Sequence, residues 1–135
     1  MSAATSAMQD YETTYRDATM DVPEFYNFGF DVVDRWATDR TKLALISVDP
    51  SGEEAEQHTF WDLKMLSNKF ANALRDLGIS KGDRVFVMLP RIPQWYVVLV
   101  GMMKLGVIPM PATTLCTPRD IEYRINQAEA VAAIT

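Results

Sequence analysis

The sequence predicts an α/β fold, in which a doubly wound parallel sheet is covered by helices on both of its faces. Two observations carry this prediction. After residue 83, segments typical of buried strands alternate with segments typical of helices, in the order strand, helix, strand, helix, strand. The first of these strands, residues 84–89, is apolar on both faces, as strands inside a covered parallel sheet usually are. A β-hairpin is expected ahead of this parallel β-α-β-α-β unit.

Composition narrows the classes of protein to which the chain can belong. It has 135 residues, of which 48% are apolar, and this is enough to build the core of one domain. With one cysteine and one histidine, the sequence offers neither a disulfide scaffold nor a zinc site built from Cys and His ligands. We therefore expect no metal ligands in this chain.

The charges are distributed unevenly along the chain. Residues 1–40 hold eight acidic and three basic residues, which accounts for the whole net charge of −5. Because no basic stripe is available to neutralise phosphates, nucleic-acid binding is not expected. The acidic N-terminal segment is unlike an Arg-rich transit peptide, so a cytoplasmic location is expected. The most apolar stretch, residues 95–112, is interrupted by Lys104 and is too short to predict a membrane span.

The chain is expected to begin with an arm and a short helix. Residues 1–21 are polar and have no hydrophobic period, which predicts a mobile N-terminal arm ahead of a folded part at residues 22–135. Residues 22–30 predict an extended lead-in, after which Asp31 is expected to cap a helix that ends near Asp39. The expected apolar face of this helix consists of Val32, Val33 and Trp36.

The hairpin is predicted from residues 43–48 and 56–60, which flank the turn sequence Asp-Pro-Ser-Gly. Thr59 is expected to cap a helix over residues 60–77, with Asp62 at its third position as the capping-box acid. Its expected buried stripe consists of Leu63, Leu66, Phe70, Leu74 and Leu77.

The rest of the chain supplies the alternation of strands and helices. After the strand at residues 84–89, Pro93 suits the first turn of a helix and Gly106 suits the position just beyond its end. The remaining expected elements are a strand over residues 107–110, a helix that begins at the cap Thr117, and a strand over residues 131–134.

No catalytic constellation stands out from the residues alone. Gly101 and Gly106 have the spacing of a phosphate loop, but the Lys and Ser/Thr that should follow are absent. His58 has no serine and acid at a suggestive spacing, and Cys116 has no local base. On this basis alone, a non-catalytic module that binds a partner through an open sheet edge stays an alternative to an enzyme.

Three segments, in their order and spacing, carry a family resemblance. Residues 59–63 read Thr-Phe-Trp-Asp-Leu, residues 77–85 contain Leu-Gly-Ile and Lys-Gly-Asp-Arg-Val, and residues 103–111 read Met-Lys-Leu-Gly-Val-Ile-Pro-Met-Pro. They resemble the first core motif, the following helix–turn–strand and the second core motif of the adenylate-forming (AMP-binding) superfamily. Within it, the medium-chain acyl-CoA synthetases are the most similar, through residues 22–28, 31–36 and 89–96.

The resemblance implies a ligase and its ligands. Members of this family make an acyl-adenylate from a carboxylic acid and ATP, and then transfer the acyl group to coenzyme A. A full-length member would therefore use ATP, Mg²⁺, CoA and a carboxylic acid, here of medium chain length or similar. The family's phosphate loop, magnesium acid and catalytic lysine match no residue of this chain. The resemblance thus implies an incomplete N-terminal fragment that is inactive alone, binds none of these ligands tightly, and has the remainder of the synthetase as its partner.

One family contact maps inside the chain. In relatives, the loop after the second core motif approaches CoA, and it corresponds to residues 112–117 here. The resemblance therefore implies a CoA-side position for Thr113, Thr114 and Leu115. Some relatives carry Gln where Leu115 stands, and Leu can offer only packing and its backbone groups. In the alternative interpretation, the threonines of this loop only cap the next helix, as is expected for Thr117.

Two further alternatives stay open. Arg91 and Trp95 lie in a segment similar to the acyl-CoA synthetases, but we expect them to anchor the start of a helix rather than to contact substrate. An aryl-CoA ligase would differ from an acyl-CoA synthetase only in its acid. No residue of this chain is assigned to the acid pocket, so the sequence does not distinguish the two.

Overall fold

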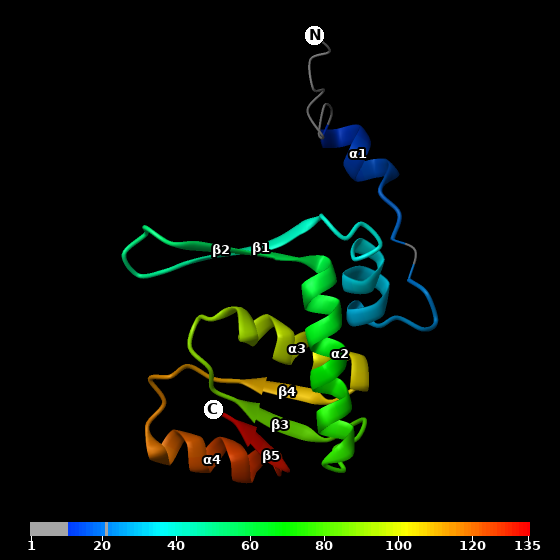
Figure 1. The fold of residues 1–135 in the computed structure, drawn as a ribbon. Helices are drawn as coiled ribbons and strands as arrows, with labels where there is room; N and C mark the ends of the chain where they lie inside the picture. Colours follow the sequence, from blue (N-terminus) through cyan, green and yellow to red (C-terminus); the bar gives the residue numbers. More distant parts are fainter. Residues whose placement is uncertain (1–10, 21) are drawn as a thin grey trace.

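The computed structural model describes residues 11–20 and 22–135 of the chain. The N-terminal helix α1 (Tyr11–Asp17) is exposed along its whole length. The predicted arm also includes residues 1–10 and 21, which lie outside the described residues, and its mobility stays a prediction. Figure 1 shows α1 standing away from the rest of the fold, which begins with the helical turn η1.

The helix after the lead-in begins earlier than the sequence predicted. It starts as a π-helical turn, η1 (Gly29–Asp34), and Asp31 is not its cap. Instead, the Asp31 carboxylate accepts a hydrogen bond from the backbone N–H of Asn27 at 2.6 Å. The expected apolar face is also partly wrong. Val33 and Ala37 are buried, one α-helical turn apart, whereas Trp36 is 48% exposed and holds the Lys42 ammonium 4.0 Å above its ring.

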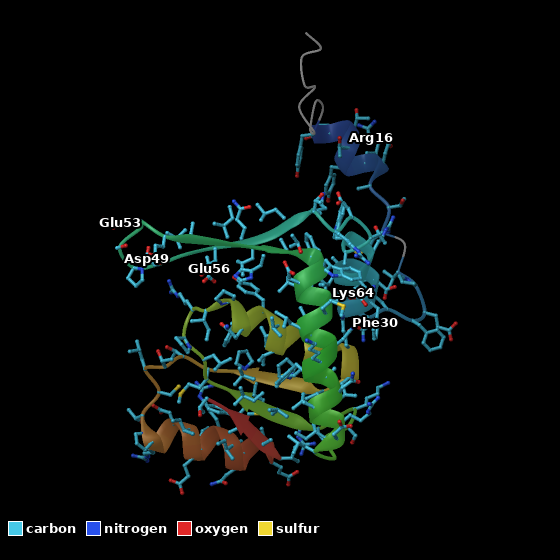
Figure 2. All side chains as sticks on the ribbon, viewed as in Figure 1. Arg16, Phe30, Asp49, Glu53, Glu56 and Lys64 are labelled. Atoms are coloured by element: carbon cyan, nitrogen blue, oxygen red, sulfur yellow. The ribbon has the colours of Figure 1, made fainter. Side chains whose placement is uncertain are left out.

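The predicted hairpin is confirmed. Strands β1 (Leu43–Val48) and β2 (Ala55–Thr59) pair in antiparallel fashion. The turn between them is built by Asp49, whose carboxylate accepts hydrogen bonds from the hydroxyl and N–H of Ser51 and from the N–H of Glu54. These hydrogen bonds, the Ser51 hydroxyl first, lower the pKa of Asp49 to about 2. Figure 2 shows Asp49 and Glu53 at the exposed tip of this hairpin.

Helix α2 (Phe60–Asp76) begins and ends as its sequence predicted. The Thr59 hydroxyl oxygen accepts the Asp62 N–H at 3.1 Å, and the Asp62 carboxylate accepts the Thr59 N–H at 2.8 Å, so a full capping box is present. The Thr59 hydroxyl hydrogen bond, followed by that of its backbone, holds the pKa of Asp62 below its usual range. Beyond the C-terminus, Gly78 adopts a left-handed conformation with φ 84°.

The buried stripe of α2 differs from the predicted one. Leu63 and Leu74 are buried, but Leu66 is 43% and Leu77 78% exposed. Ser67, which the prediction passed over, is fully buried. The reason lies on the neighbouring helix: a Cβ added to Gly101 would lie 2.8 Å from the Ser67 carbonyl oxygen. Because the missing side chain at Gly101 lets the two helices approach closely, the stripe is centred on Ser67 and leaves Leu66 at its edge.

The parallel sheet has three strands in the order β4-β3-β5. Its elements are β3 (Arg84–Val87), α3 (Pro93–Leu105), β4 (Ile108–Pro111), α4 (Pro118–Ala128) and β5 (Ala132–Ile134). Gly106 ends α3 in a left-handed conformation, and Thr117 caps α4 through a second capping box with Asp120. The predicted β-α-β-α-β unit is therefore confirmed, with boundaries within a few residues of the expected ones.

The core lies between the sheet and the α2–α3 pair. Val85 and Val87 of the central strand pack with Leu74 of α2 and Met102 of α3 in one buried cluster. Phe86 points to the opposite face because side chains alternate along a strand, and it is also fully buried. Figure 1 shows α4 beside β5 and away from α2 and α3, so the central strand is covered on both faces as predicted. Among residues 11–20 and 22–135, none of the helices combines the length and hydropathy that a membrane span requires.

Candidate functional site

The order of the sheet creates a crevice at one edge. From β3 the chain crosses to β4 on one side, and from β4 it crosses back past β3 to β5 on the other side. Because parallel crossovers are right-handed, crossovers in opposite directions place α3 and α4 on opposite faces of the sheet. The loops that leave the carboxyl ends of β3 and β4 therefore diverge. In open α/β sheets, ligands bind at such a switch point.

A cleft of about 640 Å³ lies at this point. Its floor comes from the segments that follow the two strands, residues 89–93 and 112–114, and its far wall comes from residues 45–48 of the hairpin strand β1. Trp95 and Tyr96, in the first turn of α3, complete the lining. The volume falls in the range typical of small-molecule sites. Segments that are far apart in the sequence thus meet around one hollow.

The lining of the cleft combines apolar side chains with polar groups. Side chains of Leu, Ile, Val, Pro and Trp make most of the wall. Hydroxyl groups come from Ser47, Tyr96, Thr113 and Thr114, and Arg91 is the only charged residue in the lining. Within residues 11–20 and 22–135, no carboxylate lines the cleft, although the chain as a whole carries a net charge of −5. The cleft is therefore suited to a ligand with acceptor groups and negative charge.

The structure brings two of the three predicted site residues into this cleft. Thr113 and Thr114 line it, whereas Leu115 is 86% exposed and lies outside the lining. The Thr113 hydroxyl accepts the N–H of Leu115 at 3.2 Å. The Thr114 hydroxyl makes no hydrogen bond within the described part of the chain. Thr117 instead donates its hydroxyl to Asp120 at 2.7 Å as the cap of α4, as expected.

Arg91 and Trp95 behave differently from each other. Trp95 packs against the buried cluster of α2, α3 and the sheet, as an anchor of the helix start would. Arg91 is exposed and, among the described residues, makes neither an ion pair nor a hydrogen bond. An anchoring role for the Arg91 side chain therefore has no contact to support it. Its backbone, in contrast, is fixed, because Ile92 donates its N–H to the Pro90 carbonyl at 2.9 Å.

A second polar cluster, centred on Lys104, was missed by the sequence reasoning. The ammonium of Lys104 donates to Asp34 Oδ1 at 2.6 Å and to Asn68 Oδ1 at 2.7 Å, and its side chain is only 2% exposed. It thereby joins η1, α2 and α3 (Gly29, against Lys104, leaves no room for a Cβ). The signal in the sequence was a lysine within a long apolar stretch, which was used to argue against a membrane span. We call Lys104, Asp34 and Asn68 the Lys104 cluster.

The remaining candidate residues do not come together. His58 on β2 lies 3.6 Å from the Glu56 carboxylate, and its Nε2 makes no hydrogen bond. Cys116 is a half-buried free thiol in the loop before α4. Within residues 11–20 and 22–135, no three His, Cys, Asp or Glu side chains are grouped as metal ligands would be. These residues therefore provide no catalytic or metal-binding group within the described part of the chain.

Comparisons with known proteins give the context of this cleft. The family model described as AMP-binding enzyme matches residues 32–135. The mouse (Mus musculus) protein "Acyl-coenzyme A synthetase ACSM3, mitochondrial" is 36% identical over 133 residues, which cover 93% of this chain and 23% of the relative. The chain thus spans about a quarter of the length of the curated relatives that it matches.

Solved structures agree with this fold. The structure of an acyl-CoA synthetase from Brucella canis superposes with a TM-score of 0.76 at 28% identity, covering 94% of this chain and 23% of that one. A benzoate CoA ligase from Burkholderia xenovorans superposes with a TM-score of 0.70 at 30% identity, covering 82% and 22%. Both are similar to this chain in the same mixed α/β arrangement.

Proposed function

The chain belongs to the AMP-binding enzyme family, and from this premise we propose that it is the N-terminal part of an ATP-dependent acyl-CoA synthetase. The whole enzyme would convert a carboxylic acid, ATP and CoA into acyl-CoA, AMP and pyrophosphate. The observation that carries the proposal is the cleft at the switch point of a sheet that matches acyl-CoA and aryl-CoA ligases.

We assign the loop at residues 112–115 to the CoA side of this active site. Thr113 and Thr114 line the cleft, and the Thr114 hydroxyl is free to bond a ligand. Leu115 would take part only through packing or its backbone. This side of the cleft can orient a ligand but carries no acid or base, so it supplies positioning rather than proton transfer.

The residues present do not fit ATP with Mg²⁺. Adenylation requires groups that neutralise the triphosphate and stabilise the charge that develops as the carboxylate attacks the α-phosphorus. Among the described residues no cluster of acids is placed to hold a metal ion, and the sequence has no glycine-rich loop followed by Lys. We therefore derive no adenylation step from this chain and propose that a longer protein supplies those groups.

An exchange assay tests the proposal. ATP–pyrophosphate exchange with hexanoate or octanoate, followed by thioester detection, should show no turnover by purified Met1–Thr135. The same assay on the product of the longer reading frame should show turnover, and that frame should encode a Gly/Ser/Thr-rich loop with Lys. A frame that closes directly after residue 135 would favour the non-catalytic interaction module instead. Turnover by Met1–Thr135 that is abolished by substitutions within it would overturn the assignment as a part of an enzyme.

An aryl acid is the second candidate substrate. The observation in its favour is the similarity to a benzoate CoA ligase at 30% identity, which is close to the identity with the acyl-CoA synthetase structure. Comparing benzoate with octanoate in the exchange assay decides between them. A higher rate with benzoate at equal concentration would replace the medium-chain assignment and leave the reaction class unchanged.

We further propose a cytoplasmic location for the protein. The support is the composition of residues 1–40, where eight acids outnumber three bases, which is the reverse of an Arg-rich targeting segment. The mouse relative, in contrast, is named as mitochondrial. Cell fractionation of the whole gene product tests this point, and recovery in the mitochondrial fraction would contradict it.

A further inference from the structure

We infer that the cleft holds a phosphate-binding subsite whose central group is the Arg91 guanidinium. This inference rests on the proposed function, because the phosphate in question would belong to the nucleotide end of CoA. It adds to that function a residue from a different segment, on the β3 side of the cleft rather than on the loop at residues 112–115.

The first step is the charge of the cleft. Among the described residues that line the cleft, Arg91 alone is charged, so no neighbouring carboxylate there cancels its positive charge. The excess of acidic residues lies within residues 1–40, and none of the described residues among them lines the cleft. A negative ligand is therefore attracted to this hollow even though the chain as a whole is negative.

The second step is the contrast with Arg84, at the opposite end of the same strand. The Arg84 guanidinium has internal partners: Nε donates to the Ala128 carbonyl at 2.8 Å, and Nη2 donates to the Glu129 carbonyl at 3.1 Å. Arg84 therefore ties the end of α4 to the sheet. Arg91 has the same five donors, and none of them has a partner among the described residues. The fold uses one arginine internally and leaves the other available.

The third step is the backbone of Arg91. It lies between Pro90 and Ile92, in a turn closed by the Ile92 N–H and the Pro90 carbonyl, and Pro93 follows at the start of α3. Pro90 and Pro93 fix their own φ angles on either side of this turn, and the hydrogen bond that closes the turn restricts the backbone of Arg91 between them. The base of the Arg91 side chain is thus held in place, so binding costs little backbone entropy.

The fourth step selects phosphate over carboxylate. Among the side chains of the described lining residues, hydrogen-bond donors include the Arg91 guanidinium and four hydroxyl groups, two of which belong to Thr113 and Thr114. A phosphate presents three acceptor oxygens and up to two charges, so it can use several of these donors at once. A single carboxylate paired with an exposed arginine gains little. The donor-rich, acceptor-poor chemistry therefore fits a phosphate group best.

A titration followed by amide NMR tests this subsite on the 135-residue chain. The probes are inorganic pyrophosphate, CoA, pantetheine, octanoate, and sulfate at matched ionic strength. Pyrophosphate and CoA should shift resonances of residues 89–93, and Arg91→Gln should weaken both at least fivefold. The matched control is Arg119→Gln on α4, which removes the same charge away from the cleft. It should leave the affinities for pyrophosphate and CoA unchanged. Pantetheine, which lacks phosphate, should not depend on Arg91.

The alternative outcomes are distinct. Four results would each overturn the subsite. Wild type and Arg91→Gln could bind pyrophosphate and CoA equally well, or sulfate could shift the same resonances as strongly as pyrophosphate does. Octanoate could be the one probe whose binding depends on Arg91, or pyrophosphate could cause no shift. If CoA shifts residues 112–115 equally in both proteins, the CoA-side assignment stands while the subsite fails. If pyrophosphate binding depends on Arg91 but the longer gene product lacks synthetase activity, the subsite stands and the proposed function fails.

Discussion

Lys104 and Arg91 lie at opposite ends of helix α3, and the fold treats these two cations in opposite ways. Lys104, in the last turn, is buried and satisfied by Asp34 and Asn68. Arg91, just before the first turn, faces a cleft without a partner among the described residues. A buried charge must be paired inside the protein because its desolvation is costly. An exposed charge beside a cleft is solvated by water and stays available to bind a ligand. The internal pairing of Lys104 therefore indicates a structural role, and the lack of such pairing at Arg91 favours a binding role.

Removing the acid of the Lys104 cluster should cause the largest loss of stability. Asp34→Ala leaves the Lys104 ammonium buried beside only the Asn68 oxygen. Breaking a buried pair in this way costs about 3–5 kcal/mol in the free energy of unfolding. Urea denaturation measures the effect. The double variant Asp34→Leu/Lys104→Met should regain most of the loss, because it leaves no buried charge unpaired. A single-variant loss below about 1 kcal/mol would show that water screens the cluster.

The apolar side of the same α2–α3 interface gives the next largest effect. Leu74→Ala should lower the free energy of unfolding by about 2–5 kcal/mol, because Leu74 is buried in the main core cluster. Lys69→Ala, at an exposed position of the same helix, is the matched control and should change little. Equal urea midpoints for the two variants would contradict the assigned buried face of α2.

These two predictions also mark the limit of what the sequence could provide. The caps at Thr59 and Thr117, the hairpin turn and the end of α3 at Gly106 were predicted because each depends on a few adjacent residues. The Lys104–Asp34 pair joins residues 70 positions apart, and the burial of Ser67 depends on Gly101 of another helix. Such contacts are set by packing, which no local pattern encodes.

The same distinction applies to the candidate site. Thr113 and Thr114, which the family resemblance assigns to the CoA side, line the cleft because they directly follow a strand end, and their role toward CoA stays a prediction. The part of the lining from residues 45–48 could not be predicted, because it depends on where the hairpin lies relative to the sheet. The lack of a partner for Arg91 among the described residues could not be predicted either, because it depends on all the hydrogen bonds of the folded chain. The contrast between Lys104 and Arg91 is therefore visible only in three dimensions.

A smaller effect is expected at the capped helix starts, which contrast with the Arg91 end of α3. Thr59→Ala removes the hydroxyl that accepts the Asp62 N–H, and it should cost about 1 kcal/mol near neutral pH. Since the pKa of Asp62 is lowered in the fold, its stabilisation is present above the usual Asp range and is lost as the pH falls through its lowered pKa. The difference between wild type and Thr59→Ala should therefore shrink below about pH 4. Urea midpoints across pH 3–7 check this, and a difference that grows on acidification would contradict the capping box.

The smallest effect on stability should come from the cleft itself. Arg91→Gln and Thr114→Val alter exposed side chains that make no hydrogen bond among the described residues, so each should change the free energy of unfolding by no more than about 0.5 kcal/mol. Urea denaturation of both variants gives the comparison directly. Asp34→Ala should unfold at a lower urea concentration than wild type, and Arg91→Gln should unfold at the wild-type midpoint. If Arg91→Gln destabilised the chain as much as Asp34→Ala does, its guanidinium would have an internal partner. The division between a structural cation and a ligand-facing cation on α3 would then fail. A neutral result makes any loss of phosphate binding in Arg91→Gln attributable to the lost guanidinium, because the fold that presents it is unchanged.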